Sequence, residues 1–181
     1  AVRELVPRVL RHIEETGGGA FVLFTSFRTL REVAERCAPV LRSAGYPVYI
    51  HGEDGERSQL LKRFREREDS VLFGTSSFWE GVDVRGRALR KVIITKLPLD
   101  LPDHPLIQAR HERIESNSFR DDQLPRAVLR FKQGIGRLIR SAEDSGRIVI
   151  LDPRIVTKFY GKRFMAALPD GVEPEVVTAD L

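Results

Sequence analysis

Three polar side chains recur at helical spacing near residue 135 and could together bind a phosphate. Gln133, Arg137 and Arg140 stand at positions i, i+4 and i+7, which a helix turning by about 100° per residue places on one narrow face. Arginine offers a rigid, permanently charged fork of donors that suits the terminal phosphate of a nucleotide. The spacing therefore predicts a phosphate-binding face, although arginines at this spacing also occur on ordinary solvated helices.

The opposite side of this expected helix is apolar, since Phe131, Ile135 and Leu138 fall there. We expect that side to pack into a core. Gly134 and Gly136 lie in the same segment, and each costs roughly 1 kcal/mol relative to alanine in a helix interior. Two such glycines indicate either that the helix begins later or that another group approaches the backbone closely.

A second group of polar residues follows the apolar runs at 20–24 and 71–73. Ligands of parallel-sheet folds bind outside the carboxyl ends of the strands, so residues at these positions are candidates for binding. Hydroxyl groups can hydrogen-bond phosphate, and a glycine there permits close backbone approach. Turn and cap chemistry explains the hydroxyls equally well. The candidates are Thr25, Ser26, Phe27, Thr75, Ser76, Gly81 and Asp83.

The elements that must position these residues are short apolar runs alternating with segments of helical period. We expect strands at 20–24, 48–50, 71–73, 92–94 and 148–151, and an edge strand near 176–177. We expect helices at 2–15, 28–43, 57–67, 104–117, 124–140 and 155–167. The helix at 28–43 carries Thr29 and Glu32 at capping-box spacing. This alternation predicts an α/β fold, a three-layer α/β/α sandwich with a mostly parallel sheet.

Composition excludes several kinds of protein. The chain has 181 residues, 41% hydrophobic and 31% charged, which suits one soluble domain. Cys37 is the only cysteine, so no disulfide framework or cysteine-rich metal site can form within the chain, and its helical pattern indicates a buried thiol. The four histidines lack ligand spacing, so we expect no metal site.

The chain carries a net charge of +4 and has an isoelectric point of about 9.5, which is compatible with nucleic-acid binding without establishing it. No apolar run approaches the roughly 20 residues that span a bilayer, and the first residues do not form a signal peptide. We expect no membrane partner and a cytoplasmic location, in a reducing intracellular compartment.

The machinery for nucleotide chemistry is incomplete in this sequence. No phosphate-binding loop of the G-x-x-x-x-G-K-[ST] type, the Walker A motif, occurs in it. No acidic box follows a strand to hold Mg²⁺. The chain also begins without Met, and we expect it to be a fragment of a longer protein, although removal of an initiating Met is the simpler explanation.

These segments resemble the second RecA-like (C-terminal helicase) domain of superfamily 2 helicases, within the DinG/XPD-like group. The resemblance covers roughly residues 1–170, and four motifs in order make it highly specific. Residues 21–27 resemble motif IV, 74–84 motif V, 96–98 and 102–106 the stretch after motif V, 133–140 motif VI, and 151–154 the closing strand.

The resemblance implies that residues 1–181 are a single RecA-like domain, the second motor domain of an ATP-dependent DNA helicase. Such a motor couples ATP hydrolysis to translocation on single-stranded DNA and duplex unwinding. By resemblance, Arg137 and Arg140 reach the γ-phosphate, with Arg140 as the arginine finger, and Gln133 contacts the same region. Gly136 would also bind the nucleotide.

The resemblance also implies partners. Gly81 and Asp83 would couple the nucleotide site to the nucleic-acid track. The first RecA-like domain of the same protein would hold most of the ATP and Mg²⁺, because the Walker A and B motifs are absent here. An iron–sulfur cluster, found in many members, would lie elsewhere in the full chain. Contacts to single-stranded DNA or a forked duplex would come from Thr25, Ser26, Phe27, Thr75 and Ser76.

Two alternatives remain open from the sequence. The chain could be a non-catalytic nucleic-acid-binding module, whose binding would be indifferent to Arg137 and Arg140. It could instead be the C-terminal half of an unrelated nucleotide-dependent α/β enzyme, such as a glycosyltransferase.

Overall fold

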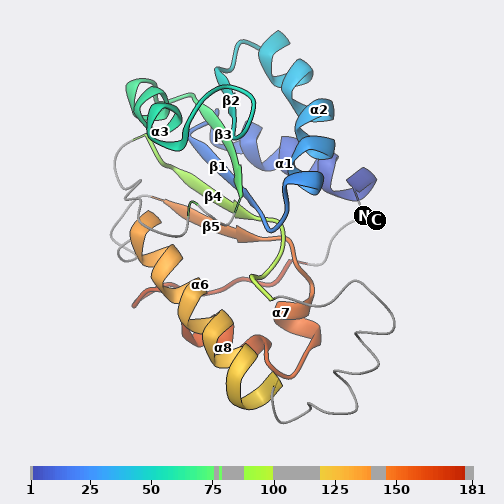
Figure 1. The fold of residues 1–181 in the computed structure, drawn as a ribbon, viewed down its shortest axis with the longest axis vertical. Coiled ribbons are helices and arrows are strands. Elements are labelled where there is room, and N and C mark those ends of the chain that lie inside the picture. The colour runs from blue at the N-terminus through green and yellow to red at the C-terminus, as the bar shows by residue number, and fades with distance from the viewer. Residues whose placement is uncertain (1, 76–77, 79–87, 100–118, 140–145, 178–181) are drawn as a thin grey trace.

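We analysed a computed structural model of the chain, which describes residues 2–75, 78, 88–99, 119–139 and 146–177. The described strands are β1 (Ala20–Phe24), β2 (Val48–Ile50), β3 (Val71–Thr75), β4 (Lys91–Ile94) and β5 (Arg147–Ile150). They form one sheet in the order β2-β3-β1-β4-β5, and every neighbouring pair is parallel. All five carboxyl ends therefore point to the same edge (Figure 1).

Helices connect and cover these strands. They are α1 (Val2–Glu15), α2 (Phe27–Ser43), α3 (Arg57–Glu66), α6 (Leu124–Leu138), α7 (Arg154–Thr157) and α8 (Gly161–Ala166), with a π-helical turn, η2 (Phe119–Gln123), before α6. The five strands expected between residues 20 and 151 are confirmed to within two residues at each end. The predicted α/β/α sandwich with a parallel sheet is confirmed as well. The helix expected at 104–117 lies outside the described residues.

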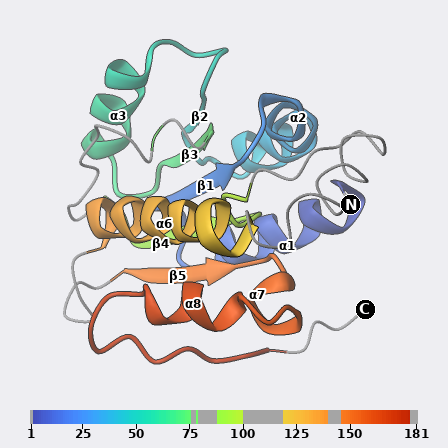
Figure 2. The ribbon, with the colours of Figure 1, turned by 60° about the horizontal axis from the view of Figure 1, so that its bottom comes forward.

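Side-chain alternation along β1 explains the three layers. Ala20, Val22 and Phe24 are buried on one face of the sheet, against α1 and α2. Phe21 and Leu23 are buried on the other face, against α3, α6 and α8. Figures 1 and 2 show these two sets of helices on opposite sides of the sheet. Because both faces are covered, the strands of a parallel sheet are continuous apolar runs rather than alternating ones.

Cys37 is fully buried on the inner face of α2, as predicted. Burial raises the pKa of its thiol to about 12, so the thiolate that reacts with electrophiles is scarce at neutral pH. None of the helices in the described ranges is long and apolar enough to cross a membrane.

Three expectations about the elements were wrong. The helix expected at 155–167 is divided into α7 and α8, because Lys158 is extended (φ −103°, ψ 148°) and Tyr160 turns into the core, where it is 6% exposed. Val176 and Val177 form no strand, and they are 64% and 74% exposed, so no apolar burial favours their pairing. The residue that caps α2 is Ser26 rather than Thr29.

The amino-terminal edge of the sheet is held by a buried lysine at the start of β4. Lys91 is 1% exposed, and its Nζ donates to the His12 carbonyl at 2.8 Å and to Glu15 Oε2 at 2.9 Å. The hydrogen bond from Lys91 lowers the pKa of Glu15. Lys91 thus supplies donors and positive charge to the last turn of α1, where helix carbonyls lack partners.

The carboxyl ends of β1, β4 and β5 are tied by two buried polar residues. The Thr95 hydroxyl donates to the Leu23 carbonyl at 2.7 Å. Asp152, which is 4% exposed, accepts from the Leu97 backbone N–H at 2.9 Å and from the Arg154 guanidinium at 2.6 Å. Burial raises the pKa of Asp152, but the hydrogen bonds from Arg154 and Leu97 outweigh it, so the net pKa lies below its ordinary value of 3.8.

We predict that Asp152→Ala lowers the free energy of unfolding by about 3 kcal/mol, because it leaves Arg154 mostly buried without its counter-charge. Since the native pKa is depressed, this contribution is present above pH 3.8 and is lost as the pH falls through the lower native value. Urea unfolding between pH 2 and 7 measures both effects.

The control is Asp69→Ala, which removes the exposed ion pair between Arg67 and Asp69. That change should cost less than about 1 kcal/mol. Equal losses for the two variants would contradict the structural role given to Asp152.

Candidate functional site

Helix α6 carries the residues of the predicted phosphate-binding face. Pro125 stands in its first turn, directly after the π-helical turn η2. The helix ends at Leu138, because Ile139 takes an extended conformation (φ −135°, ψ 123°) while its N–H still donates to the Ile135 carbonyl at 2.7 Å.

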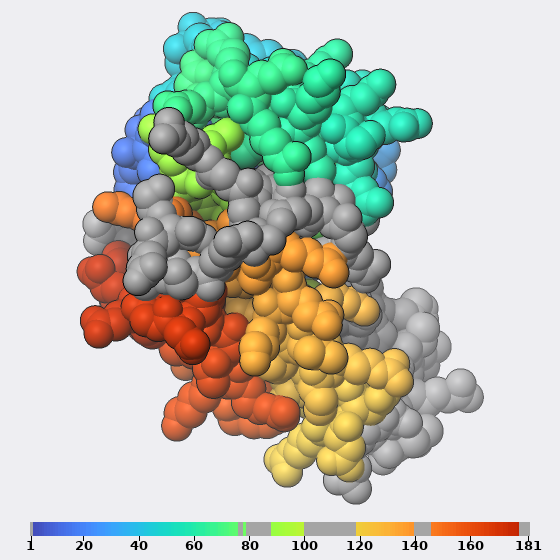
Figure 3. All heavy atoms as spheres, turned by 90° about the vertical axis from the view of Figure 1, so that its left-hand side faces the viewer, coloured from blue at the N-terminus to red at the C-terminus, as the bar shows by residue number. Residues whose placement is uncertain are grey.

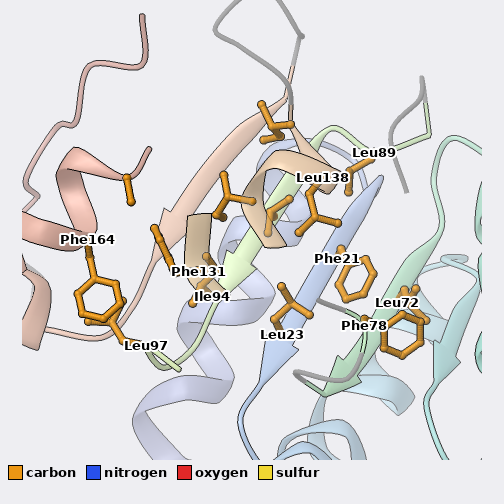
Figure 4. Close-up of a cluster of buried hydrophobic side chains, with 14 of the residues drawn as sticks. Phe21, Leu23, Leu72, Phe78, Leu89, Ile94, Leu97, Phe131, Leu138 and Phe164 are labelled. Atoms are coloured by element: carbon orange, nitrogen blue, oxygen red, sulfur yellow. The ribbon is translucent and has the colours of Figure 1, made fainter. Parts of the chain in front are cut away.

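The inner side of α6 is packed as predicted. Phe131, Ile135 and Leu138 are 0%, 1% and 4% exposed. Phe131 meets Phe164 of α8 edge to face, with ring centroids 5.4 Å apart, and Figure 4 shows it directed into the cluster that contains Ile94. Burial of each of these side chains contributes about 1.5–3 kcal/mol, so the orientation of α6 is fixed by its core.

The outer side of α6 is polar. Gln133 is exposed and Arg137 is partly exposed, on the side of the helix away from Phe131 and Ile135. Figure 3 shows α6, in orange to yellow, forming part of the molecular surface. The predicted helix with one apolar and one polar side is therefore confirmed as far as Gln133 and Arg137.

The prediction that a helix continues to residue 140 and places Arg140 on the same face as Gln133 and Arg137 is wrong, because α6 ends at Leu138. Ile139 leaves the helix, and its side chain is buried (3% exposed) beside Gly146, where an added Cβ would lie 3.1 Å from Ile139 Cδ1. Helical spacing therefore no longer relates residue 140 to Gln133. Arg140 itself lies outside the described residues.

The two glycines of α6 have different surroundings. Gly134 is buried in the helix, which argues against a helix that begins later. Gly136 is exposed, and a Cβ there would meet no atom within 4 Å. Nothing in the described part of this domain explains why residue 136 lacks a side chain.

The second group of candidates lies where β1 and β3 end. Thr25 is exposed. Ser26 Oγ accepts from the Thr29 N–H at 3.2 Å and so caps α2. Phe27, the first residue of α2, is 43% exposed, an unusual position for a large apolar ring.

Thr75 and Phe27 are joined through a histidine that the sequence did not single out. Thr75 is 5% exposed, and its Oγ1 lies 3.3 Å from His51 Nδ1. The His51 ring contacts Phe27 at a centroid distance of 4.9 Å and Phe78 at 4.7 Å. Burial, with a smaller effect of the Arg57 charge, lowers the pKa of His51, so the ring is neutral at pH 7.

His51 and Asp152 are the residues that sequence reasoning missed at this edge. Both could have been found by the rule that selected Thr25, because His51 directly follows β2 and Asp152 comes two residues after β5. The spacing of the histidines indicates no metal site, and it gives no sign of the aromatic contacts that His51 makes.

Four predicted site residues lie outside the described residues, so their places are not described. They are Ser76, Gly81, Asp83 and Arg140. Of the others, Gln133, Gly136 and Arg137 lie on α6, on one face of the sheet, whereas Phe27 opens α2 on the opposite face. Among the described residues, no group of three or more His, Cys, Asp or Glu could hold a metal ion.

Comparison with known proteins gives relatives along almost the whole chain. A protein of Escherichia coli K12 named ATP-dependent DNA helicase YoaA is 44% identical over 172 residues, which are 93% of this chain and 26% of that protein. A Bacillus subtilis protein named 3'-5' exonuclease DinG is 37% identical over an alignment of 201 positions, which covers 98% of this chain and 22% of that protein. The chain spans about a quarter of the length of these relatives.

Solved structures agree on the fold. A structure named XPD_Helicase superposes with a TM-score of 0.65 at 22% identity, covering 91% of this chain and 30% of that one. The structure of S. tokodaii Xpd4 gives a TM-score of 0.61 at 17% identity, covering 93% of this chain and 33% of that one. These matches support the RecA-like arrangement of the sheet and its helices.

A family model described as the helicase C-terminal domain matches residues 9–171, a range that contains the two-sided helix α6 and the carboxyl edge of the sheet. The chain therefore belongs to the helicase C-terminal domain family, within the DinG/XPD-like group that its motifs resemble.

Proposed function

We propose that this chain is the second motor domain of an ATP-dependent DNA helicase, coupling ATP hydrolysis to translocation on single-stranded DNA and to duplex unwinding. The observation that carries the proposal is helix α6, whose inner side is anchored in the core while its outer side presents Gln133 and Arg137. Relatives named ATP-dependent DNA helicases support the same function.

In this proposal α6 is one wall of a nucleotide site, and the first RecA-like domain of the full protein is the other. Gln133 and Arg137 fit a phosphate group, because an amide and a guanidinium supply donors and positive charge. Most contacts to ATP and Mg²⁺ would come from the first domain. Phosphoryl transfer depends almost entirely on positioning and charge stabilisation, so a rigid helix is a suitable support.

Arg140 is the proposed arginine finger. It follows Ile139, whose buried side chain ends the helix and fixes where the chain leaves α6. A finger stabilises the charge that develops on the transferred phosphoryl group. We assign Gly136 to the nucleotide side as well, and Gly81 and Asp83 to coupling between the nucleotide and the DNA.

The carboxyl edge near Phe27 is the proposed DNA contact. Thr25, Ser26 and Phe27 stand at the N-terminus of α2, where the helix dipole favours phosphate. Such contacts position a strand without reading its sequence. Thr75 and Ser76 complete the proposed set, with the buried Thr75 acting through His51. An iron–sulfur cluster, if the full protein has one, would lie outside this chain.

We predict that the isolated 181-residue chain shows no DNA-stimulated ATP hydrolysis, because it has no Walker A motif to hold the β- and γ-phosphates. Phosphate release, measured with and without single-stranded DNA, checks this. Vigorous turnover by the isolated chain would refute the proposal of a shared site.

In the intact helicase, Arg140→Ala should reduce ATP turnover by about 10³-fold or more, while affinity for single-stranded DNA stays within a factor of two of wild type. The expected pattern follows because the finger acts on the nucleotide and not on the strand. The control is Lys132→Ala, which changes an exposed residue of α6. It should change neither ATP turnover nor the affinity for single-stranded DNA. Unchanged turnover in Arg140→Ala would refute the finger assignment.

Gly136→Ala should raise the free energy of unfolding by up to about 1 kcal/mol, because the new methyl group meets open space and alanine favours the helix. The same methyl group should slow ATP hydrolysis in the intact helicase, since it occupies the surface that faces the closing domain. Urea unfolding and steady-state ATPase assays measure the two effects.

Ser43→Ala, in the last turn of α2, is the control for Gly136→Ala because it also raises helix propensity but lies on a different helix. It should stabilise the fold without slowing hydrolysis. If Gly136→Ala stabilises the fold and leaves hydrolysis intact, the glycine has no part in the nucleotide site.

A further inference from the structure

We propose that the ring of His51, together with Phe27, forms a stacking site for one unpaired nucleobase of the bound strand. This inference rests on the proposed function, because it takes single-stranded DNA as the ligand. It adds a residue and a type of contact, base stacking, to the phosphate contacts considered so far.

A shallow pocket of about 340 Å³ lies at this point of the carboxyl edge, lined by Phe27, Arg31, His51, Gly52 and Glu53. Its volume falls in the range of small-ligand sites. Phe27 brings a ring that is 43% exposed, and the partly exposed His51 ring lies 4.9 Å away, centroid to centroid. The two ring planes are inclined by 47°, so a base stacked on one ring would meet the other ring at its edge, and aromatic rings at the surface are common stacking partners for bases.

The His51 ring also contacts two residues at the end of β3 and just after it. Phe78 meets it edge to face at 4.7 Å, and Thr75 Oγ1 lies 3.3 Å from its Nδ1. These contacts fix the ring plane, so little side-chain entropy would be lost when a base stacks on it.

The loop after β2 also has the conformation that the site needs. Gly52 has φ +94°, and a Cβ at that position would lie 3.3 Å from Phe27 Cε1. A larger residue would have to strain the backbone and press on the Phe27 ring. The glycine therefore lets the loop that carries His51 and Glu53 close against Phe27.

The pocket lining carries one charge of each sign. Arg31 contributes a cation and donors, and its Nε already donates to the Phe27 carbonyl at 3.4 Å. Glu53, exposed in the same lining, places a carboxylate where a phosphate would be repelled. A base edge has both donors and acceptors, so it can use Arg31 and Glu53 together.

The test uses the intact helicase and two probes of equal length, an oligothymidylate and a strand of abasic nucleotides with the same phosphates. His51→Ala should weaken oligothymidylate binding by about 10-fold, in the range found for the loss of one stacked base. Binding of the abasic strand should stay unchanged. Phe27→Ala should show the same selective loss, and His51→Phe should bind like wild type because it keeps a ring.

His12→Ala is the matched control, since His12 is also a partly buried histidine but lies near the end of α1, on the amino-terminal side of β1; it should bind both probes normally. A strand carrying 2-aminopurine gives a second measurement, because stacking quenches its fluorescence. We expect quenching with wild type and His51→Phe, and less with His51→Ala.

Equal weakening of both probes would overturn the inference in favour of a phosphate contact or a loss of structure. Normal binding by both His51→Ala and Phe27→Ala would overturn it as well. Failure of the wild-type helicase to bind either probe would instead refute the proposed function, so the two failures can be told apart.

Discussion

The constraint on which this structure depends is that a fully parallel sheet must be covered on both faces. The connection between two parallel strands has to cross over the sheet, and here helices make most of the crossings. Phe21 and Leu23 face one helical layer, while Val22 and Phe24 face the other. The same arrangement places every described strand's carboxyl end at one edge, where loops are free to carry polar residues.

Helix α6 shows how this constraint separates stability from chemistry. Its apolar side is committed to the core through Phe131 and Ile135, so the helix has little freedom to tilt or rotate. Gln133 and Arg137 take their positions from that packing. A surface held in this way, with an open approach at Gly136, is suited to meeting a second body that supplies the rest of a nucleotide site.

Most of the fold could be predicted from the sequence because buried parallel strands are continuous apolar runs, as at residues 20–24 and 71–73. The inner face of α6 was predictable from helical spacing for the same reason. The end of α6 was not, because nothing in the local sequence marks it. Ile139 leaves the helix to fill a space beside Gly146, a contact made only in the folded chain.

The break between α7 and α8 has a similar cause, since the burial of Tyr160 outweighs the helical pattern of its neighbours. At the site, hydroxyl and aromatic residues after β1 were found by their position relative to the strand. His51 was missed although it occupies the same position after β2, because its role depends on the rings of Phe27 and Phe78, which are distant in sequence.

The strand order has a consequence for synthesis of the protein on the ribosome. β1 is central and precedes the other described strands in the chain, yet Ala20 pairs with Val71 on one side and with Lys91 on the other. Its backbone N–H and C=O groups thus stay without their strand partners until β3 and then β4 have emerged. Non-local parallel pairing of this kind is slow and exposes unpaired strand edges to aggregation. Helices α1 and α2, which contact each other and enclose one face of β1, are the elements available to shield it during that interval.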